Sequence, residues 1–199
     1  QLLEQAHDAA DHAALLADLR ASIERASRLV GQLLTSTRVS HQPMVRVPID
    51  LKRSVIGMIE ELAPIAAQKH IALSFDASDG LIVMADETLL RLLIGNIIEN
   101  AVKYTPEKGA VNVALRGTPT SICCAVTDSG PGIPEEERAH VFQRFYRVGT
   151  PQAQGTGLGL AIVAEIAARL SGEITLKTPE SGQGLVVEIT LPRAHAATN

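Results

Sequence analysis

The feature that most constrains the fold of this chain is a repeated order of secondary structure, in which a helix is followed by two short strands three times in succession. Apolar residues recur with the helical period in three segments, at 50–68, 87–103 and 157–171. Apolar runs bounded by turn residues predict six strands, at 71–76, 81–85, 110–117, 120–127, 173–178 and 184–191. A sheet with one apolar face needs a covering layer. The pattern therefore predicts an α+β fold, a two-layer sandwich in which a mixed, mostly antiparallel sheet lies on three helices.

Composition supports a packed domain and excludes several classes of protein. Of the 199 residues, 46% are hydrophobic and 20% are charged, which is too apolar for a disordered chain. The formal net charge of -4 has the wrong sign for a protein that binds nucleic acid by neutralising phosphates. No apolar run reaches about 18 residues, the length needed to span a bilayer. We therefore expect no nucleic-acid partner and no membrane contact by this chain. With no tryptophan, the core should consist of leucine, isoleucine, valine and alanine.

The first 40 residues carry a different pattern, a heptad-like apolar stripe on a helix. Its members alternate steps of three and four residues: Leu16, Leu19, Ile23, Ala26, Val30 and Leu33. The stripe predicts part of a helical hairpin over 1–40 that forms a dimer, with a stripe packed on its own domain as the alternative. The chain begins with glutamine inside an apolar-periodic segment and has no signal peptide, so we expect it to be a piece of a longer protein.

Two prolines separate this hairpin from the remainder of the chain. Pro43 and Pro48 exclude a continuous helix and predict a linker over 41–49 that contains a short strand at 45–47. Asp50 is a suitable N-cap for the helix that follows. We therefore expect a main domain and a short C-terminal tail, over 50–192 and 193–199.

Two amides and an ammonium share one face of the long helix predicted at 87–103. Asn96, Asn100 and Lys103 are spaced i, i+4 and i+7, and Glu99 lies beside them. Amide oxygens suit a hard cation such as Mg²⁺ that keeps phosphate and water ligands, and an ammonium suits a phosphate. This face predicts a metal and phosphate site, with a solvated helix face as the alternative.

The sequence Asp128-Ser-Gly130-Pro-Gly132 directly follows the strand predicted at 120–127. Such a run can be no more than a tight turn. A carboxylate at the buried end of a strand can also accept a hydrogen bond from an exocyclic amine, such as the one that adenine presents. Glycines let a flat ring approach the backbone. The motif thus predicts an adenine site, with the tight turn as the alternative.

Three glycines at alternate positions, Gly155, Gly157 and Gly159, open the helix predicted at 157–171. Backbone N–H groups at a helix N-terminus form an anion site, and glycine removes the Cβ that would block a phosphate. The spacing is neither that of the dinucleotide-binding motif nor that of a Walker loop. The three motifs follow one another along the chain, and together they favour a nucleotide site.

Four segments resemble the motifs of one family. NIIENAVKYT, DSGPG, VFQRFYR and GTGLGLAIV are similar to the N, first glycine, F and second glycine boxes of the sensor histidine kinases of bacterial two-component systems. These kinases belong to the ATPase superfamily that includes gyrase and the heat-shock chaperone, which implies a Bergerat-type ATP-binding fold. The resemblance covers about 50–192. RASRLVGQLLTSTR also resembles the second helix of the family's dimerisation and phosphoacceptor domain.

The resemblance implies that ATP and Mg²⁺ are bound and assigns residues to the phosphate end. Asn100, helped by Asn96, would hold Mg²⁺. Lys103 would contact the phosphates and Tyr104 the adenosine. Arg147, in the segment similar to the F box, would reach a phosphate when the lid closes.

The resemblance also assigns residues to the base and to the triphosphate. Asp128 would bind the adenine amino group, and Phe142 and Phe145 would anchor the base of the lid. The other implied nucleotide contacts are Gly130, Gly132 and Ile133 around the adenine, and Gly155, Gly157, Leu158 and Gly159 at the triphosphate.

The family's phosphoacceptor motif on the first hairpin helix is missing from this sequence. None of the six histidines has its context: His7, His12, His41, His70, His140 and His195. The chain would then transfer the γ-phosphoryl of ATP to a histidine outside it, for relay to a response-regulator aspartate, and would not phosphorylate itself alone. Its implied partners are ATP or ADP, its own dimerisation domain in a homodimer and a response-regulator receiver domain. Its implied location is the cytoplasmic portion of a bacterial inner-membrane protein.

Two further departures bear on function. Leu185 stands where the family often has a threonine, so a polar contact near the adenine is lost. Hydrolases of the same superfamily use a glutamate four residues before the Mg²⁺ asparagine, and here that position is Asn96. Amides cannot act as general bases, which disfavours ATP hydrolysis as the alternative function. A dimerisation or sensor module with a decayed nucleotide site is the second alternative, although the motifs are intact.

Overall fold

The computed structural model describes residues 43–148 and 157–194. The chain divides into two units, Gln1–His41 and Gln42–Asn199, and the described residues belong to the second. The hairpin predicted over 1–40, with its apolar stripe, lies outside the described residues. Within the described ranges, no helix has the length and apolar character needed to cross a membrane.

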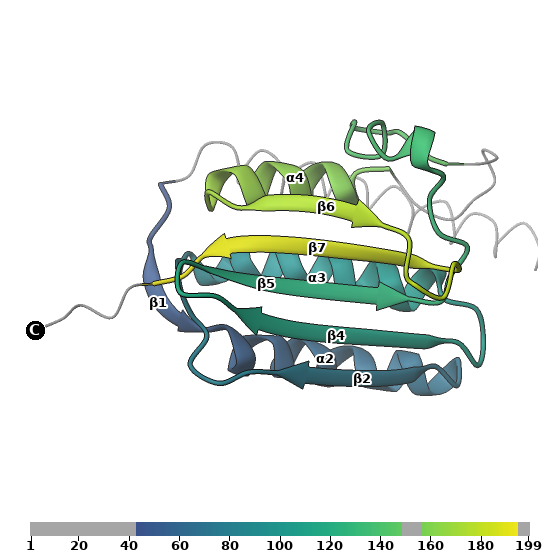
Figure 1. Ribbon diagram of the computed structural model, residues 1–199, viewed down its shortest axis with the longest axis horizontal. Coiled ribbons are helices and arrows are strands. Elements are labelled where there is room, and N and C mark those ends of the chain that lie inside the picture. Colours follow the sequence, from purple (N-terminus) through teal and green to yellow (C-terminus); the bar gives the residue numbers. More distant parts are fainter. Residues whose placement is uncertain (1–42, 149–156, 195–199) are drawn as a thin grey trace, which may run out of the picture. The chain divides into compact units, whose positions relative to one another are not determined.

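Five strands form one sheet in the order β2-β4-β5-β7-β6 (Figure 1). Their bounds in that order are β2 (Ala72–Ala77), β4 (Ala110–Gly117), β5 (Ser121–Asp128), β7 (Leu185–Pro192) and β6 (Glu173–Lys177). Strands β2 and β4 pair in parallel, whereas the other neighbours in this sheet pair antiparallel. The prediction of a mixed, mostly antiparallel sheet is therefore confirmed.

A second, two-stranded sheet joins β1 (Val47–Asp50) to β3 (Ile82–Ala85). The strand predicted at 45–47 lies slightly later in the chain, at Val47–Asp50. In its antiparallel pairing with β3, Val47 lies opposite Ala85. The adjacent strands predicted at 71–76 and 81–85 consequently enter different sheets.

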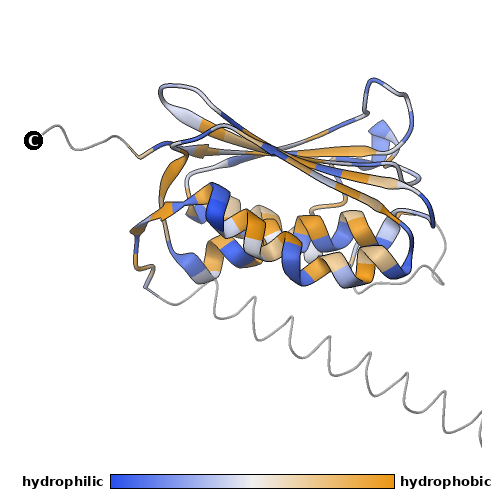
Figure 2. Ribbon diagram, turned by 90° about the horizontal axis from the view of Figure 1, so that it is seen from below, coloured by the Kyte–Doolittle hydropathy of each residue, from blue (hydrophilic) through white to orange (hydrophobic). Residues whose placement is uncertain are grey.

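Three helices cover one face of the five-stranded sheet, as Figure 2 shows: α2 (Leu51–Gln68), α3 (Glu87–Tyr104) and α4 (Gly159–Arg169). The side chain of Asp50 accepts a hydrogen bond from Arg53 N at 3.2 Å, which confirms it as the N-cap of α2. The Asp86 carboxylate caps α3 in the same way, through Thr88 N and Leu89 N. The predicted two-layer sandwich on three helices is confirmed.

Two predicted elements are shorter in the structure. The helix predicted at 157–171 begins only at Gly159, because Gly157 has a φ of +71°, which is not helical. The helical insert predicted at 134–146 is a single 3-10 turn, Glu135–Glu137, followed by further turns.

The core lies between the sheet and the helices, and α3 contacts both α2 and α4. The largest fully buried side chains are all aliphatic, which confirms the predicted core composition: Leu51, Leu81, Leu90, Leu93, Ile94, Ile97, Ile98, Leu115, Ile122, Leu158, Ile166 and Ile189. Strand β5 buries every second residue, and this alternation ends on Asp128. A carboxylate is thus placed at the rim of an apolar core.

Arg193 joins the two sheets at the end where β5 begins. Its guanidinium donates to Thr118 O and to Gly80 O, each at 2.9 Å. Its backbone N–H donates to Thr120 O at 3.0 Å. We expect Arg193→Ala to lower the free energy of unfolding by about 1–2 kcal/mol, because two charge-assisted hydrogen bonds are lost. Urea denaturation measures this loss, and an unchanged free energy would contradict the assignment.

Candidate nucleotide-binding site

The second half of α3 and the start of α4 lie against each other. A methyl group on Gly159 would lie 3.4 Å from Asn100 Nδ2 and 3.8 Å from Asn96 Oδ1. The asparagine motif and the glycine motif, which are almost 60 residues apart in the sequence, are thereby brought together. Any side chain at Gly159 would occupy the space in front of the two amides.

The Asn96 amide is oriented by its own helix. Its Nδ2 donates to Leu92 O at 2.6 Å, so its Oδ1 is left as an acceptor on the side of Gly159. Among the described residues, no group of three His, Cys, Asp or Glu side chains is placed to hold a metal ion. The donor set of this site is therefore two amide oxygens. Such a set fits Mg²⁺ that takes its remaining ligands from phosphates and water.

Lys103 and Tyr104 lie at the C-terminal end of α3. Both side chains are exposed, and Lys103 Nζ lies 5.1 Å from the centroid of the Tyr104 ring. The pair forms the rim of the region that Asn96 and Asn100 line deeper along the same helix face. An ammonium and an aromatic ring are thus presented at one edge of the site.

Asp128 is buried at the end of β5, with 8% of its surface exposed. Gly130 donates its backbone N–H to Asp128 Oδ1 at 2.8 Å. Burial raises the pKa of the Asp128 carboxyl, and hydrogen bonds from the backbone N–H groups of Gly130 and Leu185 partly oppose this shift. The carboxylate is therefore oriented by the backbone and poorly solvated. An exocyclic amine that donated to it would compensate for the missing water.

The turn after Asp128 has no space for side chains at its glycines. A methyl group on Gly130 would lie 3.0 Å from Tyr104 O, and one on Gly132 would lie 2.6 Å from Gly184 O. Gly132 also has a φ of +72°, a left-handed conformation that favours glycine. The adjoining Ile133 is half-buried. The turn is thus held between the end of α3 and the loop before β7.

Gly157 lies near the end of the segment between β5 and α4, and its backbone contacts Phe145 of the same segment. Its carbonyl accepts a hydrogen bond from Phe145 N at 2.9 Å, and a methyl group on Gly157 would lie 2.7 Å from Phe145 C. Phe145 makes this contact through its backbone, and the residue is 59% exposed. Phe142 is half-buried nearby in the sequence, and Gly155 lies outside the described residues.

The start of α4 and Arg147 both suit an anion. Helix α4 begins at Gly159, and the N-terminus of a helix carries partial positive charge that favours an anion. The Nη2 atom of Arg147 is buried and finds no hydrogen-bond partner within the described part of the chain. A buried donor nitrogen without a partner is costly, and a phosphate oxygen would satisfy it.

The segment between β5 and α4 is held by several contacts, and the sequence patterns did not predict these contacts. Arg144 forms an ion pair with Glu165 of α4, with Nη2 and Oε2 3.1 Å apart. Arg138 donates to Thr178 Oγ1 at 2.6 Å, beyond the end of β6. The Tyr146 hydroxyl donates to a Glu137 carboxylate oxygen. The partners in these pairs are not related by helical or strand spacing. The sequence therefore shows that the side chains can form hydrogen bonds, but it does not show with which partner.

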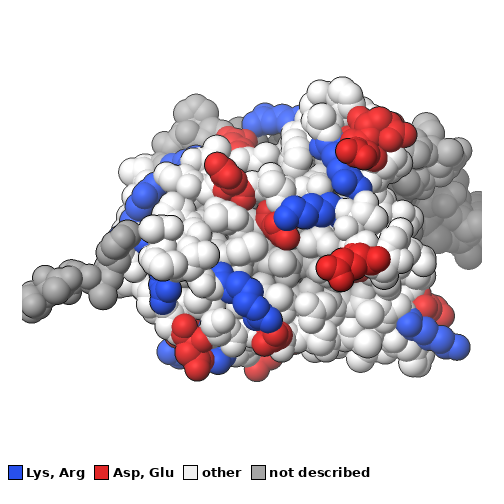
Figure 3. All heavy atoms as spheres, viewed as in Figure 1, with Lys and Arg blue, Asp and Glu red and all other residues white. Residues whose placement is uncertain are grey.

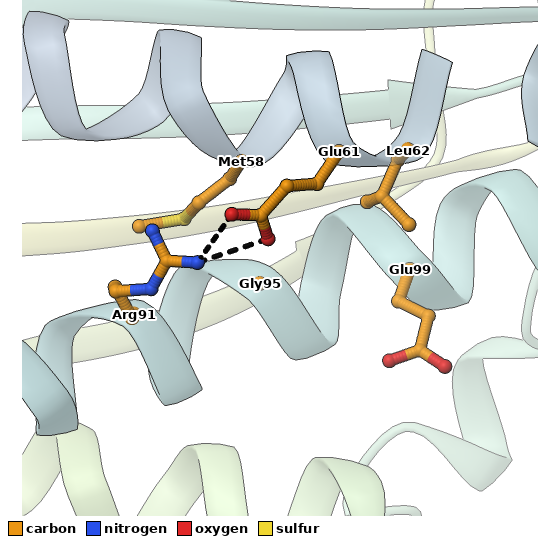
Figure 4. Close-up of a pocket in the computed structure, with 6 residues that line it drawn as sticks. All are labelled: Met58, Glu61, Leu62, Arg91, Gly95 and Glu99. Carbon is orange, nitrogen blue, oxygen red and sulfur yellow. Dashed lines mark hydrogen bonds and ion pairs between the residues drawn. The ribbon is translucent and has the colours of Figure 1, made fainter. Parts of the chain in front are cut away.

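A separate cavity of about 130 Å³ lies between α2 and α3 (Figure 4). Arg91 donates to both carboxylate oxygens of Glu61, at 2.7 and 2.9 Å, on one side of it. Glu99 also lines this cavity. Glu99 is exposed, and its carboxylate points away from α2 in Figure 4, whereas the asparagines lie beside Gly159 at the start of α4.

Charged side chains on the exposed face of the sheet are interspersed in sign (Figure 3). Several pair across neighbouring strands: Lys177 of β6 lies 2.6 Å from Glu188 of β7, and Arg116 of β4 pairs with Asp76 of β2. On this face, the charges follow strand pairing and form no single-sign field.

The raised pKa of Asp128 has a consequence for stability. A carboxyl whose pKa is raised by folding contributes stability that is full below its ordinary pKa, about 4, and is lost as the pH rises through the raised value. Asp128→Asn removes this titration. We expect the variant to melt at a higher temperature than the unchanged chain at neutral pH, and the difference to vanish in acid. Calorimetry across this pH range checks the sign, and a less stable variant at neutral pH would contradict it.

Comparisons with known proteins identify the family of this chain. Residues 85–195 match the model of the family described as histidine kinase-, DNA gyrase B-, and HSP90-like ATPase. The sensor protein kinase PmrB of Pseudomonas aeruginosa is 33% identical over 97% of this chain. The swarming motility regulation sensor protein RssA of Serratia marcescens is 28% identical over 98% of it. The chain spans 41% and 42% of the lengths of these two relatives.

A solved structure with a nucleotide analogue has the same fold. Full-length ShkA in complex with AMPPNP superposes with a TM-score of 0.79 and 30% identity, over 93% of this chain and 39% of ShkA. A nucleotide analogue thus occurs in a structure that shares this architecture. The family match covers more than half of the 199 residues. The chain therefore belongs to the histidine kinase-, DNA gyrase B- and HSP90-like ATPase family, and both relatives named above are sensor kinases or sensor proteins.

Proposed function

We propose that this chain is the ATP-binding catalytic part of a two-component sensor histidine kinase. It transfers the γ-phosphoryl group of ATP to a histidine outside the chain, for relay to an aspartate of a response regulator. The observation that carries the proposal is the convergence of Asn96 and Asn100 with Gly159 at one site. Asp128 is buried at the end of β5, and the Nη2 atom of Arg147, in the segment between β5 and α4, is buried without a hydrogen-bond partner among the described residues.

Each end of the site matches one end of ATP. Asp128 accepts the hydrogen bond of the adenine amino group, and the turn of Gly130, Gly132 and Ile133 forms the wall beside the base. Tyr104 contacts the adenosine. The backbone N–H groups of Gly157, Leu158 and Gly159, with Gly155 before them, bind the triphosphate.

Charge stabilisation is the main task at the phosphate end. Asn100 and Asn96 would hold Mg²⁺, which would neutralise part of the phosphate charge. Lys103 and Arg147 would add positive charge at the phosphates. The attacking imidazole belongs to the acceptor histidine.

The geometry supports phosphotransfer over hydrolysis. A water-activating base would have to lie beside the phosphates, and the amide of Asn96 cannot accept a proton. The neighbouring carboxylate of Glu99 lines the cavity at α2. The described side chains that face Gly159 therefore bind and orient ATP without activating water.

We also propose an organisation for the whole protein from the sequence patterns. We propose that 1–40 is part of a dimerising helical hairpin, that 41–49 links it to the catalytic domain of 50–192, and that 193–199 forms a tail. A homodimer through the hairpin and a receiver domain of a response regulator are the proposed protein partners. The proposed location is the cytoplasmic side of a bacterial inner membrane.

Phosphotransfer in trans tests this function. The chain is mixed with Mg²⁺, ATP labelled at the γ-phosphorus and a separate hairpin that carries the acceptor histidine. We expect label on the hairpin only when the chain is present, and no label on the chain alone. Replacing the acceptor histidine by glutamine serves as the control. Labelled chain without the hairpin, or an unlabelled hairpin at saturating ATP, would contradict the proposal.

A further inference from the structure

Lys69, the C-cap residue directly after α2, reaches across to the end of α3. Its Nζ donates to Val102 O at 2.8 Å, Lys103 O at 2.9 Å and Thr105 O at 2.6 Å. An ammonium has three hydrogens to donate, so backbone carbonyls account for all of them. The last carbonyls of a helix have no partner within the helix and carry partial negative charge. One side chain therefore provides the C-terminal cap of α3.

We propose that Lys69 is a positioning residue for the nucleotide: it fixes the end of α3 from which the site presents Lys103 and Tyr104. This inference rests on the proposed ATP site and adds a residue outside all of its motifs. The role follows from where the three carbonyls lie. One of them belongs to Lys103 itself, and the other two lie on either side of the Lys103–Tyr104 pair.

The same helix end touches the adenine side of the site. A methyl group on Gly130 would lie 3.0 Å from Tyr104 O, so the turn that follows Asp128 packs directly on Tyr104. Lys69 binds carbonyls on both sides of this residue. Lys69 O also accepts a hydrogen bond from Lys108 N at 3.0 Å, which holds the segment after α3. A shift of the α3 end would therefore displace both the aromatic rim and the turn that holds Asp128.

The two ends of α3 are fixed by different means. Asp86 caps the N-terminal end, which is remote from the site, and Lys69 caps the end beside it. Loss of the Lys69 ammonium would leave the carbonyls of Val102 and Lys103 without this partner. The helix end would then fray where the nucleotide binds, although the rest of α3 stays buried against the sheet.

Lys69→Met tests the inference, because methionine keeps the apolar stem and removes the donors. We expect the affinity for ATP in the presence of Mg²⁺ to fall about tenfold, since small displacements at a binding site are costly. Lys69→Arg keeps a charged donor, and its affinity should lie between those of the methionine variant and the unchanged chain. Isothermal titration well below the melting temperature measures all three proteins.

Arg193→Ala is the matched control. Arg193 also donates to backbone carbonyls of other elements, but at the opposite end of β5. Both variants should melt at lower temperatures, and only Lys69→Met should bind ATP more weakly. Equal weakening in the two variants, or unchanged affinity in a folded Lys69→Met variant, would overturn the inference. Failure of the unchanged chain to bind ATP would instead contradict the proposed function.

Tyrosine emission gives a second measurement that does not depend on ligand. The chain has two tyrosines and no tryptophan, so Tyr146→Phe leaves Tyr104 as the only emitting ring of these types. In this background, Lys69→Met should lower the fluorescence anisotropy of Tyr104, and Arg193→Ala should leave it unchanged. Unchanged anisotropy with Lys69→Met would show that Lys69 does not hold the α3 end.

Discussion

Asn100→Ala is expected to weaken the binding of ATP in the presence of Mg²⁺ by about 100-fold, because a metal-holding group is removed from a site with few donors. The amides of Asn100 and Asn96 lie beside Gly159 in space, and no acidic cluster of the described residues can replace their oxygens. Binding in the absence of Mg²⁺ should change much less. Titration with ATP, with and without Mg²⁺, measures both effects.

Glu99→Ala is the control on the same helix. Glu99 is the immediate neighbour of Asn100, and it lines the cavity at α2. The change alters the charge of the chain by one unit and should leave Mg²⁺-dependent binding within about twofold, since the charge of this exposed side chain is screened by solvent and salt. A Glu99→Ala variant as weak as Asn100→Ala would mean that overall charge, and not a metal-holding amide, governs the affinity.

Gly157→Ala is expected to abolish phosphotransfer and to weaken ATP binding by on the order of 100-fold, because the triphosphate loop can no longer keep its backbone position. A methyl group at this position would lie 2.7 Å from Phe145 C and 2.8 Å from Tyr146 O. The φ of +71° also disfavours any residue with a Cβ. Both effects displace the backbone at Leu158 and Gly159, where α4 begins.

Gly57→Ala separates this effect from a general intolerance of alanine. Gly57 lies inside α2, and a methyl group there would meet nothing within 4 Å. Alanine is a better helix former, so this variant should gain about 0.5–1 kcal/mol of stability and keep full affinity for ATP. If Gly157→Ala bound ATP as tightly as Gly57→Ala, the assignment of the triphosphate to this loop would be wrong.

The sequence allowed the elements to be predicted because each has a local period. Strand β5 buries Ile122, Cys124 and Val126 in alternation, and α3 buries one continuous side. Such periods specify which face is apolar, but they do not specify the neighbouring strand. For that reason, the adjacent strands β2 and β3 were not expected to enter different sheets.

The candidate site was predicted where backbone chemistry limits the choice of residue. Glycines at positions without space for a Cβ, such as Gly130 and Gly157, leave a visible signal in the sequence. Long charged side chains leave none, because a lysine that caps a distant helix is indistinguishable by pattern from one on the surface. Lys69 and Arg193 are both of this kind, and only the fold shows what they hold.

Titration of the 199-residue chain with ATP is the most direct test of the central claim, that the described domain holds a Mg²⁺-dependent ATP site. The account predicts one ATP per chain, micromolar affinity with Mg²⁺ and clearly weaker binding when Mg²⁺ is chelated. GTP should bind far more weakly, because it presents a carbonyl where Asp128 needs a donor. Absence of binding at millimolar ATP with Mg²⁺ present would contradict the account.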